Sequence, residues 1–294
     1  MKKILITGGS GFIGKNIAES YLKDKYELFV PLRSELDCSD DESVKNYFAR
    51  HYFDVIIHSA GKPGHRNAKE VNTLLYTNSR MLFNFLTQRH RWGKILHTGS
   101  GAAYDMRHYY PKMKESYFGT HVPADDYGYN KHIYGRILPL IDEAYDLRIF
   151  GVFGKYEDYS IRFISNAICK AIHGLPITLR QNRNFDYLYI NDLMPILEYF
   201  IEHSPVERSF NLTPDHSAGL TELAGIVKNI SRKPLDIIVA QEGMGVAYSG
   251  DNALLKAEIK NLALTPMEQS IAELYDWYGK NTANINKELL LVDK

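Results

Sequence analysis

The sequence predicts an α/β fold: a doubly wound parallel sheet followed by a smaller C-terminal α/β lobe. Short apolar runs alternate with amphipathic, helix-like segments over the first 150 residues. Strands separated by helices form βαβ units with a parallel sheet. Runs such as KILIT, DVII and KILH are apolar without a period of two, which is typical of strands that are covered on both faces.

The individual elements follow from the apolar spacing along the chain. We expect strands at 3–7, 27–32, 54–58, 94–98 and 146–150. Helices are expected at 12–22, 40–50, 78–89 and 127–144, with Ser39 as the N-cap of the second helix. Beyond residue 150 the sequence predicts helices at 163–173, 191–203 and 267–278, and extended segments at 176–179 and 187–190.

Composition excludes several classes of protein. The 294 residues are 45% hydrophobic, and 35 Lys and Arg balance 35 Asp and Glu, so no basic excess for nucleic acid is present. Two cysteines cannot form a disulfide framework, and no apolar run approaches the ~20 residues of a membrane span. The eleven histidines have no metal-ligand spacing, so we expect no metal. His58 is expected in the core, and four others are expected in loops or at helix ends: His65, His90, His108 and His121. We expect a soluble, cytoplasmic protein.

A glycine-rich turn lies between the first strand and the first helix. It reads Thr7-Gly-Gly-Ser-Gly-Phe-Ile-Gly14 and contains a G-x-G-x-x-G spacing. Glycines permit the sharp turn, the approach of a pyrophosphate and close helix–strand packing, while the helix N-terminus attracts phosphate. The sequence therefore predicts dinucleotide binding by a Rossmann domain, with these contacts: Gly8, Ser10, Gly11, Phe12, Ile13 and Gly14. We assign residues 1–155 to this domain, with 185–203 returning to it, and 156–294 mainly to a substrate-binding lobe.

The end of the second strand bears on which dinucleotide binds. A carboxylate there would hold the adenosine ribose of NAD, but the strand ends Pro31-Leu32-Arg33. A guanidinium suits the 2′-phosphate of NADP because it can donate two charge-assisted hydrogen bonds. Arg33 favours NADP, although Glu35 leaves NAD possible.

A serine, a tyrosine and a lysine are the candidate catalytic residues. Ser100 follows the fourth strand, at the sheet edge where ligands of α/β folds collect. Tyr127 and Lys131 are four residues apart on one helix face. An ammonium beside a phenol favours proton exchange with a substrate hydroxyl or carbonyl. The nearby Tyr109 and Tyr134 are expected to be packing or substrate-wall residues.

Taken together, these motifs resemble the extended short-chain dehydrogenases/reductases, the family of nucleotide-sugar epimerases, dehydratases and reductases. The matching pieces, in order, are TGGSGFIG at 7–14, DVIIHSAG at 54–61, Asn78, HTGSGAAY at 97–104, Tyr127-x-x-x-Lys131, LRIFGVFG at 147–154 and FDYLYINDL at 185–193. They span nearly the whole chain.

The resemblance implies roles for further residues. Ser100, Tyr127 and Lys131 would be the catalytic trio, with Lys131 also touching the nicotinamide ribose. The remaining cofactor contacts would be Asp37 and Cys38 at the adenine, Ser59, Ala60 and Gly61 at the ribose and phosphates, and Asn78. Substrate diphosphate would meet arginines of the C-terminal lobe: Arg162, Arg180 and Arg183. The family also implies a homodimer formed by the helices at 78–90 and 127–144.

Departures from the family pattern narrow the reaction. Gly101-Ala102 stands where family dehydratases carry an Asp-Glu pair, and Ala102 replaces the cysteine of the GDP-fucose synthase type. Gly151 replaces a common asparagine, so one diphosphate contact must come from elsewhere. We therefore expect NADPH-dependent reduction of a nucleotide-diphospho 4-keto-6-deoxyhexose. A 4-epimerase with tightly bound NAD is the alternative, and a non-enzymatic dinucleotide sensor is the third hypothesis.

Overall fold

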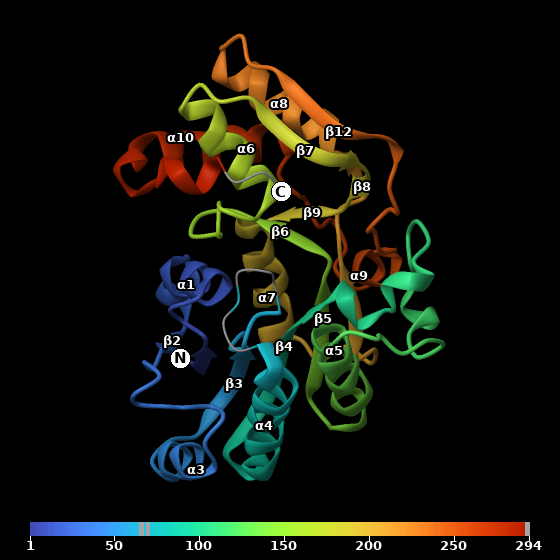
Figure 1. Ribbon diagram of the computed structural model, residues 1–294. Helices are drawn as coiled ribbons and strands as arrows, with labels where there is room; N and C mark the ends of the chain where they lie inside the picture. Colours follow the sequence, from blue (N-terminus) through green and yellow to red (C-terminus); the bar gives the residue numbers. More distant parts are fainter. Residues whose placement is uncertain (65–67, 69–70, 292–294) are drawn as a thin grey trace.

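The computed structural model describes residues 1–64, 68 and 71–291. Its centre is a six-stranded parallel sheet in the order β10-β5-β4-β3-β1-β2 (Figure 1). The strands are β1 (Lys3–Thr7), β2 (Glu27–Phe29), β3 (Phe53–His58), β4 (Trp92–Ser100), β5 (Ala144–Ile149) and β10 (Ser209–Leu212). The chain crosses from β2 past β1 to β3, which confirms the predicted doubly wound α/β sheet.

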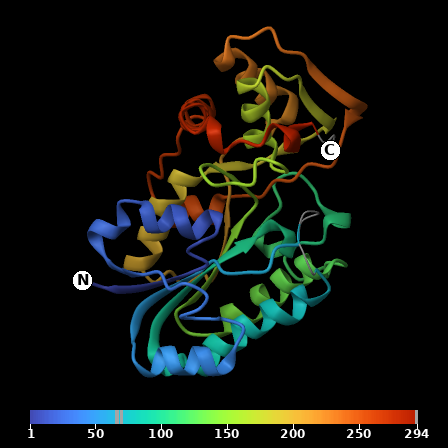
Figure 2. The same cartoon turned by 60° about the vertical axis from the view of Figure 1, so that its left-hand side comes forward.

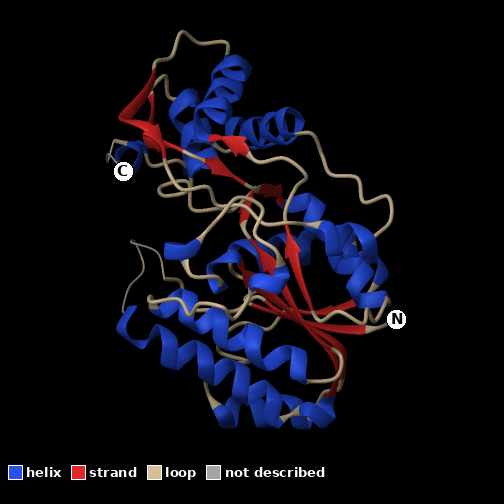
Figure 3. Ribbon diagram, turned by 90° about the vertical axis from the view of Figure 1, so that its right-hand side faces the viewer, coloured by secondary structure: helices blue, strands red, loops and turns tan. Residues whose placement is uncertain are grey.

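Helices cover both faces of this sheet, as Figures 2 and 3 show. One face carries α1 (Phe12–Glu19), the short α2 (Leu22–Lys25) and α7 (Leu193–Glu202), and the other carries α3 (Asp41–Ala49), α4 (Leu74–Thr87) and α5 (Asp126–Ile137). Successive residues of β1 serve the two faces. Ile4 and Ile6 pack in the cluster that contains Ile17, while Leu5 packs in the cluster that contains Phe85. The apolar strands are therefore buried on both sides, as predicted.

The C-terminal lobe packs on the carboxyl ends of the strands (Figure 1). It contains the helices α6 (Phe163–Ile172), α8 (Leu220–Ser231), α9 (Ala253–Glu258) and α10 (Met267–Lys280). Three small sheets complete it: β6 (Gly151–Phe153) with β9 (Tyr187–Tyr189), β7 (Ile177–Asn182) with β12 (Ile237–Met244), and β8 (Asn184–Phe185) with β11 (Ala218–Gly219). Residues 209–212 rejoin the central sheet as β10, whereas β9 pairs outside it.

Several element boundaries differ from the prediction for local reasons. The N-cap of α3 is Asp40, not Ser39, because the Asp40 carboxylate accepts the Ser43 N–H at 2.8 Å. The predicted helix at 127–144 ends as α5 at Ile137, since Pro139 lies in the following 3-10 turn and disfavours helix before it. Similarly, β2 ends at Phe29, two residues before Pro31. No helix in the described ranges could cross a membrane.

Candidate functional site

The glycine turn and the end of β3 form one structure, the cofactor cradle (residues 7–14 and 58–62). Gly8 has φ +71°, and a Cβ there would lie 2.8 Å from the Ala60 nitrogen. A Cβ on Gly14 would lie 2.3 Å from the Gly8 carbonyl oxygen, which also accepts the Gly11 N–H at 2.9 Å. The backbone segments are therefore so close that side chains at these positions would separate them.

Polar contacts fix the two sides of the cradle to each other. The Ser59 hydroxyl donates to the Thr7 carbonyl at 2.6 Å, and the Ala60 N–H donates to the Thr7 hydroxyl at 3.1 Å. Buried Asn78 accepts the Lys62 N–H at 2.7 Å and donates to the Lys62 carbonyl at 3.1 Å. The Asn78 side chain thus holds the backbone of the residue that follows Gly61.

The cradle fits a dinucleotide pyrophosphate. Gly11 is the N-cap of α1, so the first N–H groups of that helix, at Phe12 and Ile13, have no partner within the helix. Their side chains pack against the large core cluster, while Ser10 and Gly11 are exposed. Unpaired N–H groups at the positive end of a helix attract phosphate oxygens.

Beyond β2, the predicted adenosine contacts form a small polar group. The Arg33 side chain is 79% exposed, and its Nε and one terminal nitrogen each lie 3.0 Å from Asp37 Oδ2. Burial alone would raise the pKa of Asp37, but hydrogen bonds from Ser39 and Arg33 hold it below its ordinary value. Glu35 accepts the Leu32 N–H at 2.7 Å.

Cys38 differs from its neighbours because its thiol is buried in the core. Burial raises the pKa of this thiol to about 12. The Cys38 carbonyl accepts a hydrogen bond from the Asn84 side-chain amide at 3.0 Å. An adenine contact at Cys38, as the resemblance implies, would have to use the backbone.

Helix α5 is fastened to the turn that follows β4, and this fixes Tyr127 relative to Ser100. The Ser100 hydroxyl oxygen accepts the Ala102 N–H at 3.1 Å at the start of the turn Gly101–Ala103. A Cβ on Gly128 would lie 2.7 Å from the Ala102 carbonyl oxygen, and His132 bonds the Ala103 carbonyl at 3.1 Å. The helix therefore begins against the serine turn.

Lys131 lies one helical turn after Tyr127 in α5, and its side chain contacts β4. Its Nζ is 5.9 Å from the centre of the Tyr127 ring and donates to the Thr98 carbonyl at 3.2 Å. The Nζ also lies 3.4 Å from Nε2 of His97, which is buried. Motif reasoning missed His97, although its place in β4, three residues before Ser100, is visible in the sequence.

Two buried histidines, His58 and His97, lie close enough to Lys131 for its charge to act on them. His58, fully buried as expected, bonds the Thr7 hydroxyl at 2.9 Å, and burial together with Lys131 lowers its pKa to about 3. The same causes hold the pKa of His97 well below its ordinary value. Both rings are therefore neutral at neutral pH. His65 lies outside the described residues.

The three predicted substrate arginines lie at different places in the C-terminal lobe. Arg162 precedes α6, and Arg183 lies between β7 and β8; both lower the pKa of the Tyr187 phenol, which burial raises more strongly. Arg180 is exposed on β7. Arg162 and Arg183 thus act electrostatically on one tyrosine, Tyr187.

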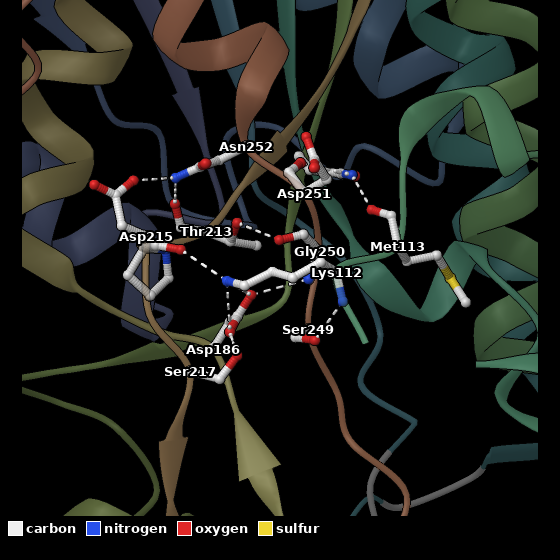
Figure 4. A network of polar contacts seen from close by, with 12 residues as sticks. Lys112, Met113, Asp186, Thr213, Asp215, Ser217, Ser249, Gly250, Asp251 and Asn252 are labelled. Atoms are coloured by element: carbon white, nitrogen blue, oxygen red, sulfur yellow. Dashed lines mark hydrogen bonds and ion pairs between the residues drawn. The ribbon is translucent and has the colours of Figure 1, made fainter. Parts of the chain in front are cut away.

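A network of polar contacts holds four separate segments together beside the site, and we call it the clamp (residues 112–113, 184–186, 213–217 and 248–252; Figure 4). Fully buried Asp186 accepts the Gly250 N–H at 2.9 Å and the Ser217 hydroxyl, and its Oδ2 lies 3.4 Å from Lys112 Nζ. The Lys112 N–H donates to the Ser249 hydroxyl at 2.8 Å. These contacts fix the backbone of residues 248–252.

Comparison with known proteins agrees with this geometry. The sequence profile of the NAD dependent epimerase/dehydratase family matches residues 4–213. The chain belongs to this family. Membership confirms the resemblance that the motifs indicate, and the matched region includes the cradle, Ser100, Tyr127 and Lys131.

Individual proteins are similar to this chain over different lengths. GDP-L-fucose synthase from Azorhizobium caulinodans is 34% identical over 92 residues, which cover 31% of this chain and 30% of that protein. The match therefore spans about a third of this relative. The GDP-L-fucose synthetase of Naegleria fowleri bound to NADP has a TM-score of 0.81 at 18% identity, covering 96% and 94% of the two chains. A GDP-mannoheptose C4 reductase from Campylobacter jejuni with NADP bound has a TM-score of 0.78 at 18% identity, covering 94% and 98%.

Proposed function

We propose that the protein is an NADPH-dependent reductase of a nucleotide-diphospho 4-keto-6-deoxyhexose. The observation that carries this proposal is the catalytic corner: Tyr127 begins a helix packed against the Ser100 turn, with Lys131 Nζ 5.9 Å from its ring. This corner lies at the carboxyl edge of the sheet, near the cradle. Such an arrangement can protonate a carbonyl oxygen beside a bound dinucleotide.

Each residue of the corner has a separate task. Bound NADPH supplies a hydride to the carbonyl carbon. The Ser100 hydroxyl, whose oxygen already accepts the Ala102 N–H, donates its own proton to the substrate oxygen and orients it. Tyr127 transfers a proton to the same oxygen as the alcohol forms, and the ammonium of Lys131 favours the phenolate that remains.

Two features favour reduction over the other reactions of the family. Gly101 and Ala102 supply no acid or base next to Ser100, and loss of water from the sugar or a double epimerisation at C3 and C5 would need one. Exposed Arg33 is suited to the 2′-phosphate of NADP, and the similar structures from Naegleria fowleri and Campylobacter jejuni hold NADP. These two proteins, a GDP-L-fucose synthetase and a GDP-mannoheptose C4 reductase, also support a nucleotide-linked sugar as the substrate class.

The test is turnover with purified protein. A panel of GDP- and dTDP-linked 4-keto-6-deoxyhexoses is mixed with NADPH, and loss of reduced nicotinamide is followed together with the product mass. We expect stoichiometric NADPH oxidation and a product heavier by two hydrogens with at least one sugar. Stoichiometric, non-exchanging NAD released on denaturation, together with isomerisation at constant mass, would instead establish the 4-epimerase.

We also propose a homodimer through α4 and α5. The exposed side chains of these helices include three large hydrophobic residues: Tyr76, Phe83 and Tyr129. An exposed apolar helix face is a common protein-binding surface. We expect the wild-type protein to have the mass of a dimer in light scattering and Phe83→Glu to have the mass of a monomer. A wild-type monomer contradicts the proposal.

A further inference from the structure

A tyrosine from the C-terminal lobe reaches the turn that follows Ser100, Gly101–Ala103, which we call the catalytic turn. A Cβ placed on Gly101, the residue after Ser100, would lie 2.8 Å from the hydroxyl oxygen of Tyr248. Tyr248 is far from this turn in sequence and belongs to the clamp. Its hydroxyl therefore lies next to the residue that follows Ser100.

Aromatic packing fixes the direction of the Tyr248 ring. Its centre lies 5.0 Å from the ring centres of Phe150 and Phe185 and 5.3 Å from that of Tyr109. The Tyr109 hydroxyl donates to the Gly101 carbonyl at 2.7 Å, which ties this aromatic group to the catalytic turn. The ring therefore has little freedom to swing away from Ser100.

The backbone of Tyr248 is held from both sides. Its N–H donates to the Asn184 carbonyl at 2.9 Å, and its carbonyl accepts the Asp186 N–H at 3.0 Å. Two residues later, Gly250 donates to the buried Asp186 carboxylate (Figure 4). A side chain with both its ring and its backbone fixed is preorganised, and a hydrogen-bond donor on it need not be ordered during the reaction.

The hydroxyl of Tyr248 remains protonated at neutral pH. Burial raises the pKa of this phenol, and Ser100 and Tyr109 offset only part of the rise. The phenol is therefore a hydrogen-bond donor and not a competing base.

Building on the proposed function, we propose that Tyr248 is a further catalytic residue whose hydroxyl donates a hydrogen bond to the substrate carbonyl oxygen alongside Ser100. As hydride reaches the carbon, negative charge grows on this oxygen, and two preorganised donors stabilise it. The proton that completes the alcohol comes from Tyr127, while Tyr248 keeps its own. The C-terminal lobe would thereby contribute to the chemistry in addition to binding the nucleotide.

The experiment compares Tyr248→Phe, which removes the hydroxyl and keeps the ring, with the wild type under steady-state conditions. We expect kcat to fall by about 10- to 100-fold, with KM for the sugar and the Kd for NADPH within about twofold of wild type. Tyr52→Phe is the matched control, because Tyr52 is exposed beside the amino end of β3. Its kcat should be unchanged.

A double variant tests whether the two donors share one oxygen. If Ser100 and Tyr248 stabilise the same charge, the fold-loss of kcat in the double variant Ser100→Ala, Tyr248→Phe should differ from the product of the fold-losses in the two single variants. If the wild type turns over and Tyr248→Phe retains more than half of the wild-type kcat, the role of Tyr248 is overturned and the proposed function stays intact. Absence of wild-type turnover with every sugar would overturn the proposed function itself. A higher KM at unchanged kcat would overturn catalysis by Tyr248, since it indicates ground-state binding alone.

Discussion

The cofactor cradle and the clamp are both built around tight backbone contacts, but they are assembled differently. The cradle joins residues 7–14 to residues 58–62, and glycines make its contacts possible. The clamp joins four segments between residues 112 and 252, and the buried carboxylate of Asp186, in one of these segments, contacts the other three. One region depends on the absence of side chains and the other on a particular side chain.

This difference has consequences for function. The cradle offers mainly backbone N–H groups, so it suits a ligand portion that many proteins share, such as a pyrophosphate. The clamp offers side chains such as Tyr248, whose position depends on distant parts of the chain. Cofactor binding and substrate chemistry should therefore respond separately to mutation, and the following substitutions test this separation.

The largest expected effect is that of Tyr127→Phe. This change removes the proton donor and leaves the cradle untouched, so kcat should fall by about 10²- to 10⁴-fold while NADPH binds as in wild type. Turnover and fluorescence titration of NADPH measure the two properties. If NADPH binding fell in parallel with kcat, the catalytic corner and the cradle would not be separable.

The next largest effect is expected in the cradle. Gly14→Val places a Cβ 2.3 Å from the Gly8 carbonyl oxygen and must push α1 away from β1, so NADPH affinity should fall by at least about 100-fold. Circular dichroism checks that the variant still folds. The matched control is Gly225→Ala in α8, where a Cβ meets nothing within 4 Å. It should bind NADPH normally and unfold with a free energy about 0.5–1 kcal/mol higher than wild type.

The same contrast explains what the sequence could predict. The cradle and the Tyr127–Lys131 pair are local patterns in which spacing alone determines the geometry, so the central sheet and the candidate trio were accessible from the motifs. His97 and Tyr248 carry no local pattern. Their placement depends on strand register in β4 and on the contacts of Asn184 and Asp186 with residues 248–250, which only the folded chain brings together.

Two carboxyl groups outside the cradle and the clamp, those of Glu157 and Asp37, give the stability of the fold opposite dependences on pH. In the C-terminal lobe, burial raises the pKa of Glu157 from 4.5 to about 8, while Ser165 donates to it at 2.6 Å. Between these values the folded protein holds a proton that the unfolded chain has lost, so stability decreases as pH rises through this window. Asp37, near the cradle, has a lowered pKa, and its contribution is lost as pH falls.

Glu157→Gln keeps the shape of the side chain and removes its titration. The difference in unfolding free energy between variant and wild type should grow in favour of the variant by up to about 1.4 kcal/mol per pH unit inside the window. Urea unfolding from about pH 5 to about pH 9 measures this slope. Glu207→Gln, at an exposed glutamate before β10, is the matched control. A flat difference for Glu157→Gln would show that the Glu157 carboxyl is not protonated in the folded state at neutral pH.

The smallest expected effect lies at the rim of the cofactor site. Arg33 is exposed and already forms an ion pair with Asp37, and solvent weakens its contact with a 2′-phosphate. Arg33→Ser should weaken NADPH binding by about tenfold, or about 1.4 kcal/mol, and leave NADH binding within about twofold. Arg33→Lys keeps the charge but loses the planar, two-point geometry, so its loss should be intermediate. Fluorescence titration with both coenzymes decides the matter. Equal losses for NADPH and NADH would mean that Arg33 meets a part common to both, and the preference for NADP would then have to come from another residue.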